Sequence, residues 1–101
     1  MPQAISLDEL VAISEHWPMK LAIEASALKS LLRMPKSDAA ELRAKLKTFA
    51  ADPYGQHPWA KAFGNGIGRV RHGDWRAVYS IDGGAMLITV IKVGNRREIY
   101  R

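Results

Sequence analysis

The chain has 101 residues and 48% apolar content, which suits one domain with a single modest core. It contains no cysteine, so disulfides and thiolate metal sites are excluded, and its three histidines lack the spacing of a zinc site. No segment approaches the run of about 20 apolar residues that a membrane helix needs, and the first residues lack the layout of a signal peptide. We therefore expect a soluble, cytoplasmic protein whose chemistry uses no metal and no cofactor.

Charge is distributed unevenly along the chain. The net charge is +5, but residues 1–18 hold three acidic residues and no Lys or Arg, whereas all 15 basic residues follow them. A cationic surface of this size on a small domain favours nucleic acid or an acidic protein as partner. The alternative is a solvated basic surface that has no partner.

The N-terminal residues form a unit of their own. Ser6 or Asp8 can cap a helix that Pro18 ends, so we interpret residues 1–18 as a helical extension and residues 19–101 as the domain. The extension either caps the edge of the next strand or masks the basic surface of the domain.

The domain begins with a strand and two helices. Residues 19–24 alternate apolar and less apolar side chains, as a strand does. Residues 25–34 then predict a short helix that Pro35 ends. Asp38 and Glu41 have the spacing of a capping box for a second helix with one apolar stripe. The two helices are predicted to form an α-hairpin.

The second helix is expected to end at Asp52-Pro53, where the composition changes. Residues 54–66 are rich in Gly, Pro, His and Asn, which predicts a surface loop anchored by Trp59 and Phe63.

The remaining residues predict β-structure. Residues 67–71 and 75–81 flank Gly73-Asp74, which suits a two-residue II′ hairpin. Residues 82–84 form a second turn before a strand at 85–93 that is apolar on both sides and therefore interior. Together, the predicted helices and strands form one α+β domain.

The hairpin register gathers arginines on one face of the sheet. With Gly73-Asp74 as the loop, Arg71 lies opposite Arg76 and Arg69 lies opposite Val78, so the three arginines share a face. The other face is apolar and suits an α-hairpin as cover. We expect that face to receive Val70, Trp75, Ala77, Tyr79, Ile81, Met86, Ile88 and Val90.

An arginine pair across two strands has an electrostatic cost. Like charges directly opposite one another destabilise a sheet by some tenths of a kcal/mol, whereas a guanidinium can bind a phosphate through two hydrogen bonds. A bound anion would relieve the repulsion. The alternative is compensation by Asp or Glu side chains of the same chain.

Two stretches resemble a known family. Residues 68–82 contain Arg-Val-Arg-His-Gly-Asp-Trp-Arg, and residues 90–101 contain Val-Gly-Asn-Arg-Arg-Glu-Ile-Tyr-Arg. Both are similar to the RelE/ParE toxins of bacterial type II toxin–antitoxin systems. The resemblance implies a RelE-like fold, with an α-hairpin packed on one face of a twisted antiparallel sheet of about four strands.

In the RelE branch, the resemblance implies a ribosome-dependent mRNA endoribonuclease that inhibits translation. The ribose 2′-hydroxyl attacks the adjacent phosphate, and no metal takes part. The resemblance implies a catalytic set that consists of Arg69, Arg71, Arg76, Arg96 and Tyr100. It assigns phosphate binding or transition-state stabilisation to the arginines, and base stacking or proton transfer to the tyrosine. It assigns RNA binding to Lys61, Trp75 and Arg97, with Lys61 on the loop.

The proton acceptor is not fixed by these residues, because an arginine has a pKa above about 12 and is a poor base. Asn95 stands where many relatives have histidine. The candidates are Tyr100, Glu98 and His72. The alternatives are a rim position beside the turn for His72, a salt bridge for Glu98 and a sheet-edge aromatic for Tyr100.

Two other functions are compatible with the same fold. One is that of a ParE-like inhibitor of DNA gyrase, and the other is that of an inactive toxin homologue that acts as a binding module. The expected partners are a cognate antitoxin, the ribosome and mRNA, with no membrane, and with DNA only indirectly through the antitoxin. Homodimerisation is left open.

Overall fold

The computed structural model describes residues 19–99. The predicted helix at 1–18, its boundary with the domain, and Tyr100 lie outside these residues. The described elements are β1 (Lys20–Ile23), α2 (Ala25–Arg33), α3 (Lys36–Ala51), β2 (Ala60–Gly64), β3 (Ile67–His72), β4 (Trp75–Asp82), β5 (Leu87–Asn95) and α4 (Arg96–Ile99).

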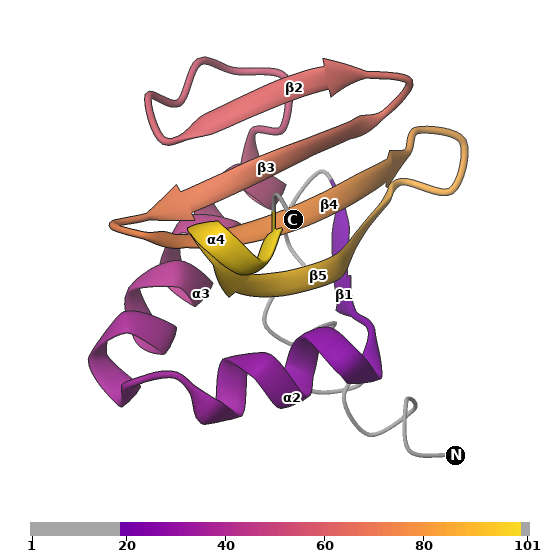
Figure 1. The fold of residues 1–101 in the computed structure, drawn as a ribbon. Coiled ribbons are helices and arrows are strands. Elements are labelled where there is room, and N and C mark those ends of the chain that lie inside the picture. The colour runs from indigo at the N-terminus through magenta and orange to yellow at the C-terminus, as the bar shows by residue number, and fades with distance from the viewer. Residues whose placement is uncertain (1–18, 100–101) are drawn as a thin grey trace.

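The strands form one sheet in the order β1-β5-β4-β3-β2 (Figure 1). β1 pairs with β5 in parallel, and the other neighbours are antiparallel. The prediction of an α+β fold is confirmed. The sheet has five strands rather than about four, and it is not wholly antiparallel, because the chain passes through α2 and α3 between β1 and the meander of the other strands.

The additional strand is β2, which occupies part of the predicted loop at 54–66. It pairs with β3 through Ala60 opposite Val70 and Lys61 opposite Arg69, so Lys61 lies on a strand and not on a loop. Alanine and glycine have low strand propensity, which explains why the sequence of this short edge strand did not predict it. Its position extends the face that carries the arginines.

The apolar core lies between the sheet and the helices α2 and α3. Leu42 and Leu46 from α3 and Val70, Ile88 and Val90 from the strands are fully buried. In Figure 1, α3 passes behind the sheet, whereas the short α4 lies in front of β4 and β5. The α-hairpin therefore covers one face only, as predicted. No helix among residues 19–99 is long and apolar enough to cross a membrane.

Three further predicted details are wrong. Phe63 does not anchor a loop, because it lies on β2 and is 50% exposed. Met86 is not on the core face but in the turn between β4 and β5, where it is 47% exposed and has a φ of 54°. The turn is longer than expected because the Asp82 carboxylate accepts a hydrogen bond from the backbone N–H of Ala85 at 3.1 Å. The capping box of Asp38 and Glu41 is also absent, because α3 begins at Lys36, directly after Pro35.

The β3–β4 hairpin has the predicted register, with Arg71 opposite Arg76 and Arg69 opposite Val78. Gly73 has a φ of 57°, the left-handed conformation that glycine favours at the first position of such a loop. The Lys45 ammonium of α3 donates a hydrogen bond to the Arg71 carbonyl at 3.2 Å. The helical layer therefore holds the hairpin that carries the arginines.

Gly68 provides a test of this packing. It lies opposite Tyr79, and a Cβ at position 68 would come within 2.6 Å of the Lys61 carbonyl oxygen and also overlap the Tyr79 hydroxyl. Burial raises the pKa of that hydroxyl. Gly68→Ala is expected to lower the free energy of unfolding by about 1–3 kcal/mol, because the strand backbone must move. Urea denaturation measures this change.

Gly83→Ala is the matched control, because a Cβ there would meet only the Tyr54 hydroxyl, at 3.7 Å. Its effect is expected to stay within about 0.5 kcal/mol. Equal stabilities of the two variants would contradict the described packing of Tyr79 over Gly68.

Candidate functional site

The face of the sheet opposite the core carries five cations in two rows. Lys61 on β2 pairs with Arg69 on β3, Arg69 pairs with Val78 on β4, and Val78 pairs with Lys92 on β5. In the second row, Arg71 pairs with Arg76, which pairs with Gly94. We call this surface the cationic face; its charged residues are Lys61, Arg69, Arg71, Arg76 and Lys92.

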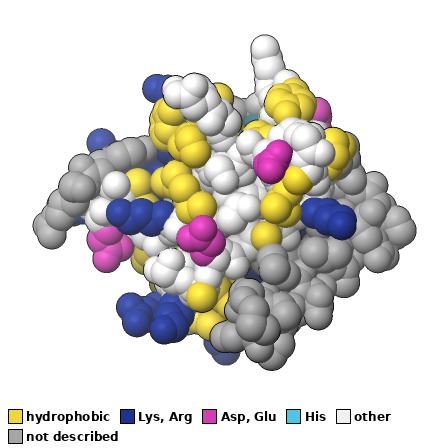
Figure 2. Space-filling model, turned by 90° about the vertical axis from the view of Figure 1, so that its right-hand side faces the viewer, with side chains coloured by type: hydrophobic (Ala, Val, Ile, Leu, Met, Phe, Trp, Pro, Cys, Tyr) yellow, Lys and Arg dark blue, Asp and Glu magenta, His cyan; other side chains and the backbone are white. Residues whose placement is uncertain are grey.

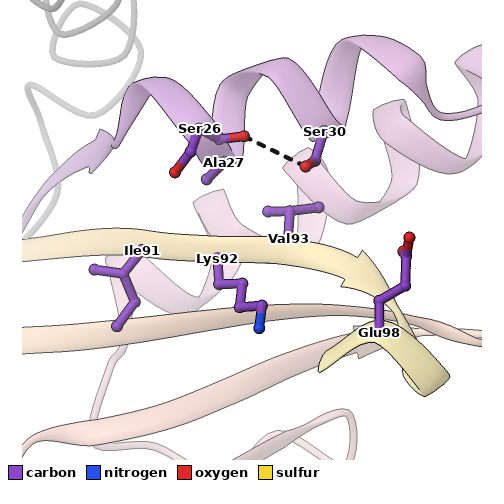
Figure 3. Close-up of a pocket in the computed structure, with 7 residues that line it drawn as sticks. All are labelled: Ser26, Ala27, Ser30, Ile91, Lys92, Val93 and Glu98. Atoms are coloured by element: carbon purple, nitrogen blue, oxygen red, sulfur yellow. Dashed lines mark hydrogen bonds between the residues drawn. The ribbon is translucent and has the colours of Figure 1, made fainter. Parts of the chain in front are cut away.

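Lys92 belongs to this face because β5 contains a β-bulge. The pairing shifts by one residue between Val78 opposite Lys92 and Tyr79 opposite Val90, which leaves Ile91 without a partner. Strict alternation from the buried Val90 would have put Lys92 on the core side and Val93 outside. Figure 3 shows the reverse, with Val93 on the α2 side of β5 and Lys92 on the other side.

Arg76 is the most buried charged residue of the described chain, at 9% exposure. One terminal nitrogen of its guanidinium, Nη1, donates to the Gly73 carbonyl at 2.7 Å and to the Trp75 carbonyl at 3.1 Å. These bonds fix the guanidinium beside the hairpin turn. Its Nε is buried and has no hydrogen-bond partner, and the same is true of the Nε of Arg69.

Within residues 19–99, no carboxylate compensates the cationic face. The ion pair among these residues joins His72 and Asp38, at 3.1 Å. An unsatisfied buried donor costs about 1–3 kcal/mol. Arg69 and Arg76 are diagonal neighbours on adjacent strands, so their side chains are within reach of one common anion. The described carboxylates therefore do not supply the compensation that was the alternative to a bound anion.

α4 closes one end of the cationic face. Gly94 is buried opposite Arg76, and a Cβ at position 94 would meet the Glu98 carboxylate at 3.1 Å and Ile99 at 3.6 Å. Glycine therefore lets α4 pack directly over β5. The backbone N–H of Arg96 donates to the Asp74 carbonyl at 2.6 Å, which joins the start of α4 to the hairpin turn.

A capping box holds this short helix in place. The Asn95 side-chain oxygen accepts a hydrogen bond from the N–H of Arg97 at 3.1 Å, and the Glu98 carboxylate accepts one from the N–H of Asn95 at 2.8 Å. Asn95 and Glu98 thus have structural contacts. Arg96 and Arg97 are exposed, and with Asp74 and Asn95 they line a surface hollow of about 440 Å³ beside the turn.

The structure separates the predicted site residues into two groups. Arg69, Arg71, Arg76 and Lys61 share the cationic face, and Arg96 and Arg97 lie at its end. Trp75 packs against the core on the other face. His72 also lies on the helical side, with Nε2 at 3.1 Å from Asp38 and Nδ1 at 3.5 Å from Lys45.

Figure 2 turns the molecule by 90°, so that the front of Figure 1 is on the left. Most of the Lys and Arg side chains visible in this view gather on that left-hand side.

Known proteins share this sequence pattern. The family described as "ParE toxin of type II toxin-antitoxin system, parDE" matches residues 21–100. The chain is 31% identical over 94 residues to Toxin RelE of Mycobacterium tuberculosis H37Rv, and the match covers 88% of this chain and 93% of that protein. The chain belongs to the RelE/ParE family of type II toxins.

Solved structures of RelE toxins have the same fold. The archaeal RelE–RelB complex from Pyrococcus horikoshii OT3 matches with a TM-score of 0.69 at 21% identity, over 78% of this chain and 96% of that one. The isolated E. coli RelE toxin matches with a TM-score of 0.65 at 24% identity, over 79% and 88% of the two chains. The predicted RelE-like fold is thereby confirmed.

Two features of this RelE/ParE chain were missed from sequence although signals for them exist. Ile88 and Val90 are buried at alternate positions, as in a regular strand, but the next buried residue, Val93, comes three positions after Val90. This spacing indicates one inserted residue, which turns Lys92 to the face opposite the core. Asn95 and Glu98 have the spacing of a capping box.

The capping box generates a prediction about α4. Asn95→Ala should destabilise α4 by about 1 kcal/mol, because the N–H of Arg97 loses its acceptor. Amide hydrogen exchange at Arg97 should then be faster by about fivefold, while exchange at the core residue Val70 should be unchanged. Unchanged exchange at Arg97 would contradict the described cap.

Proposed function

We propose that this chain is a ribosome-dependent mRNA endoribonuclease that inhibits translation. The observation that carries the proposal is the cationic face, on which Arg69, Arg71 and Arg76 lie together without a compensating carboxylate in residues 19–99. Such a site is suited to a phosphate, which offers several acceptor oxygens and negative charge. The name of the M. tuberculosis relative, Toxin RelE, agrees with this proposal.

The proposed reaction is attack of a ribose 2′-hydroxyl on the adjacent phosphorus. The new O–P bond forms as the bond to the 5′-oxygen of the next nucleotide breaks, which leaves a 2′,3′-cyclic phosphate. Negative charge accumulates on the phosphate oxygens in the transition state, and fixed donors stabilise it because they need no reorganisation. Arg76, held by two turn carbonyls, and Arg69 are assigned this role, with Arg71 and Arg96 as further phosphate contacts.

Proton transfer is assigned to Tyr100. The other two candidates have different contacts, since His72 lies on the helical face beside Asp38 and the Glu98 carboxylate accepts the N–H of Asn95. As the phenolate, a tyrosine can take the proton of the 2′-hydroxyl, and as the resulting phenol it can give that proton to the departing 5′-oxygen, whereas the arginines remain charged throughout.

An antitoxin is the proposed protein partner, as RelB is for RelE in the P. horikoshii complex. An acidic segment would complement the cationic face, and any contact with DNA would be made through that antitoxin. A cytoplasmic location stays a prediction.

Inhibition of DNA gyrase is the second candidate function. It is favoured by the match of residues 21–100 to the ParE toxin family. A gyrase inhibitor needs a protein-binding surface but no ribonuclease chemistry, so a cleavage assay and a supercoiling assay separate the two functions.

The arginine site generates a prediction for activity. Arg76→Ala is expected to reduce the rate of ribosome-dependent mRNA cleavage by about a hundredfold or more, because a fixed donor to the transition state is lost. Primer extension on mRNA after a timed reaction measures the rate. Arg43→Ala, an exposed arginine on α3, is the matched control and should cleave as the wild type does.

Because Arg76 is buried, its replacement can also affect folding, so the thermal denaturation of Arg76→Ala is compared with that of the wild type. Arg71→Ala replaces an exposed side chain of the same face and should also slow cleavage, by a smaller factor. Full cleavage activity in both variants would overturn the proposal. Loss of DNA supercoiling without mRNA cleavage by the wild type would favour the gyrase function.

The role of Tyr100 has a separate signature. Tyr100→Phe should slow cleavage by about tenfold to a thousandfold and leave the affinity for a non-cleavable 2′-O-methyl RNA within twofold, since only a proton-transfer group is removed. Single-turnover cleavage and fluorescence anisotropy measure the two quantities. An equal loss of affinity and rate would indicate base stacking instead.

A further inference from the structure

The bulge in β5 extends the cationic face beyond the arginines. It turns Lys92 to the side of Arg69 and Arg76 while Val93 enters the core (Figure 3). The Lys92 side chain is exposed, and no carboxylate of residues 19–99 lies within 4.0 Å of its ammonium nitrogen. It is therefore a free cation at the edge of the proposed phosphate site.

Lys92 has a counterpart at the other end of the same row. Lys61, Arg69, Val78 and Lys92 are paired directly across β2, β3, β4 and β5. Neighbouring strands are about 4.8 Å apart, so the two lysine positions are separated by about 14 Å. Arg69, with its unpartnered Nε, lies between them.

One phosphate cannot contact both ends of this row. A chain of phosphates can do so if its backbone crosses the strands, with one phosphate held between Arg69 and Arg76 and others on either side. Lysine suits the outer positions because its ammonium binds as a mobile point charge and imposes no bidentate geometry.

We infer that Lys92 forms a phosphate-binding subsite, and that single-stranded RNA crosses β2 to β5 with flanking phosphates at Lys61 and Lys92. This inference rests on the proposed function and adds the direction of the RNA and a contact residue. An acidic peptide is the competing occupant of the row, and its binding is an outcome of the test below.

The experiment measures the salt dependence of RNA binding by the full chain. The probes are a fluorescent 2′-O-methyl hexanucleotide and a dinucleotide with one phosphate, and the variants are Lys92→Gln and Lys61→Gln. Lys29→Gln, an exposed lysine on α2, is the control with the same change of charge. Each phosphate contact contributes about 0.7 to the slope of log affinity against log salt for single strands.

Lys92→Gln and Lys61→Gln should each lower the slope for the hexanucleotide by about 0.7 and weaken binding about two- to fivefold. Lys29→Gln should change neither quantity, and Lys92→Arg should restore both. Binding of the dinucleotide should be insensitive to Lys92→Gln, because its phosphate occupies the arginine pair.

The inference is overturned if Lys92→Gln behaves as Lys29→Gln does, or if Lys92→Gln weakens only the binding of an acidic antitoxin peptide. In both cases the proposed function survives provided that Arg76→Ala slows ribosome-dependent mRNA cleavage as predicted. Failure of the wild type to bind either oligonucleotide would overturn the inference, whereas absence of ribosome-dependent mRNA cleavage by the wild type would overturn the proposed function.

Discussion

The register of the β3–β4 hairpin determines the position of every arginine in the central part of the cationic face. Gly73 adopts the left-handed conformation at the loop, so Arg71 pairs with Arg76 and Arg69 with Val78. A shift of one residue in either strand would send that strand's arginines into the core and its apolar side chains into solvent. Burial of Val70, Ala77 and Tyr79 therefore determines which face of the sheet the arginines occupy.

The same arrangement has a cost that packing alone does not explain. Arg71 faces Arg76, and the Nε atoms of Arg69 and Arg76 are buried without partners. A fold selected only for stability would replace these side chains by neutral ones, because buried unsatisfied donors are rare in native proteins. The Gly73 and Trp75 carbonyls orient Arg76, so the site is organised before any ligand arrives. Organisation of this kind is expected where charge develops during a reaction.

Sequence alone predicted the elements whose signals are local. Gly73-Asp74 predicted the hairpin and its register, and the prolines at 35 and 53 marked the limits of α2 and α3. β2 was missed because Ala60 and Ala62 have low strand propensity. They form a strand because they pair with β3. The bulge at Ile91 was missed because residues 85–93 were predicted as one regular strand, although Val93 breaks the alternation. Tertiary pairing decided both cases, and both changed the site by adding Lys61 and Lys92 to one face.

The central claim is that Arg69 and Arg76 together hold a phosphate of RNA. Nuclear magnetic resonance of the arginine Nε–Hε groups, assigned with Arg69→Lys and Arg76→Lys, tests it most directly. On addition of a 2′-O-methyl RNA, the account predicts that both Nε–Hε signals shift strongly, since a phosphate bound at a guanidinium changes the electrostatic environment of its Nε–Hε group. Saturating RNA that leaves these two signals unchanged while shifting others would contradict the account.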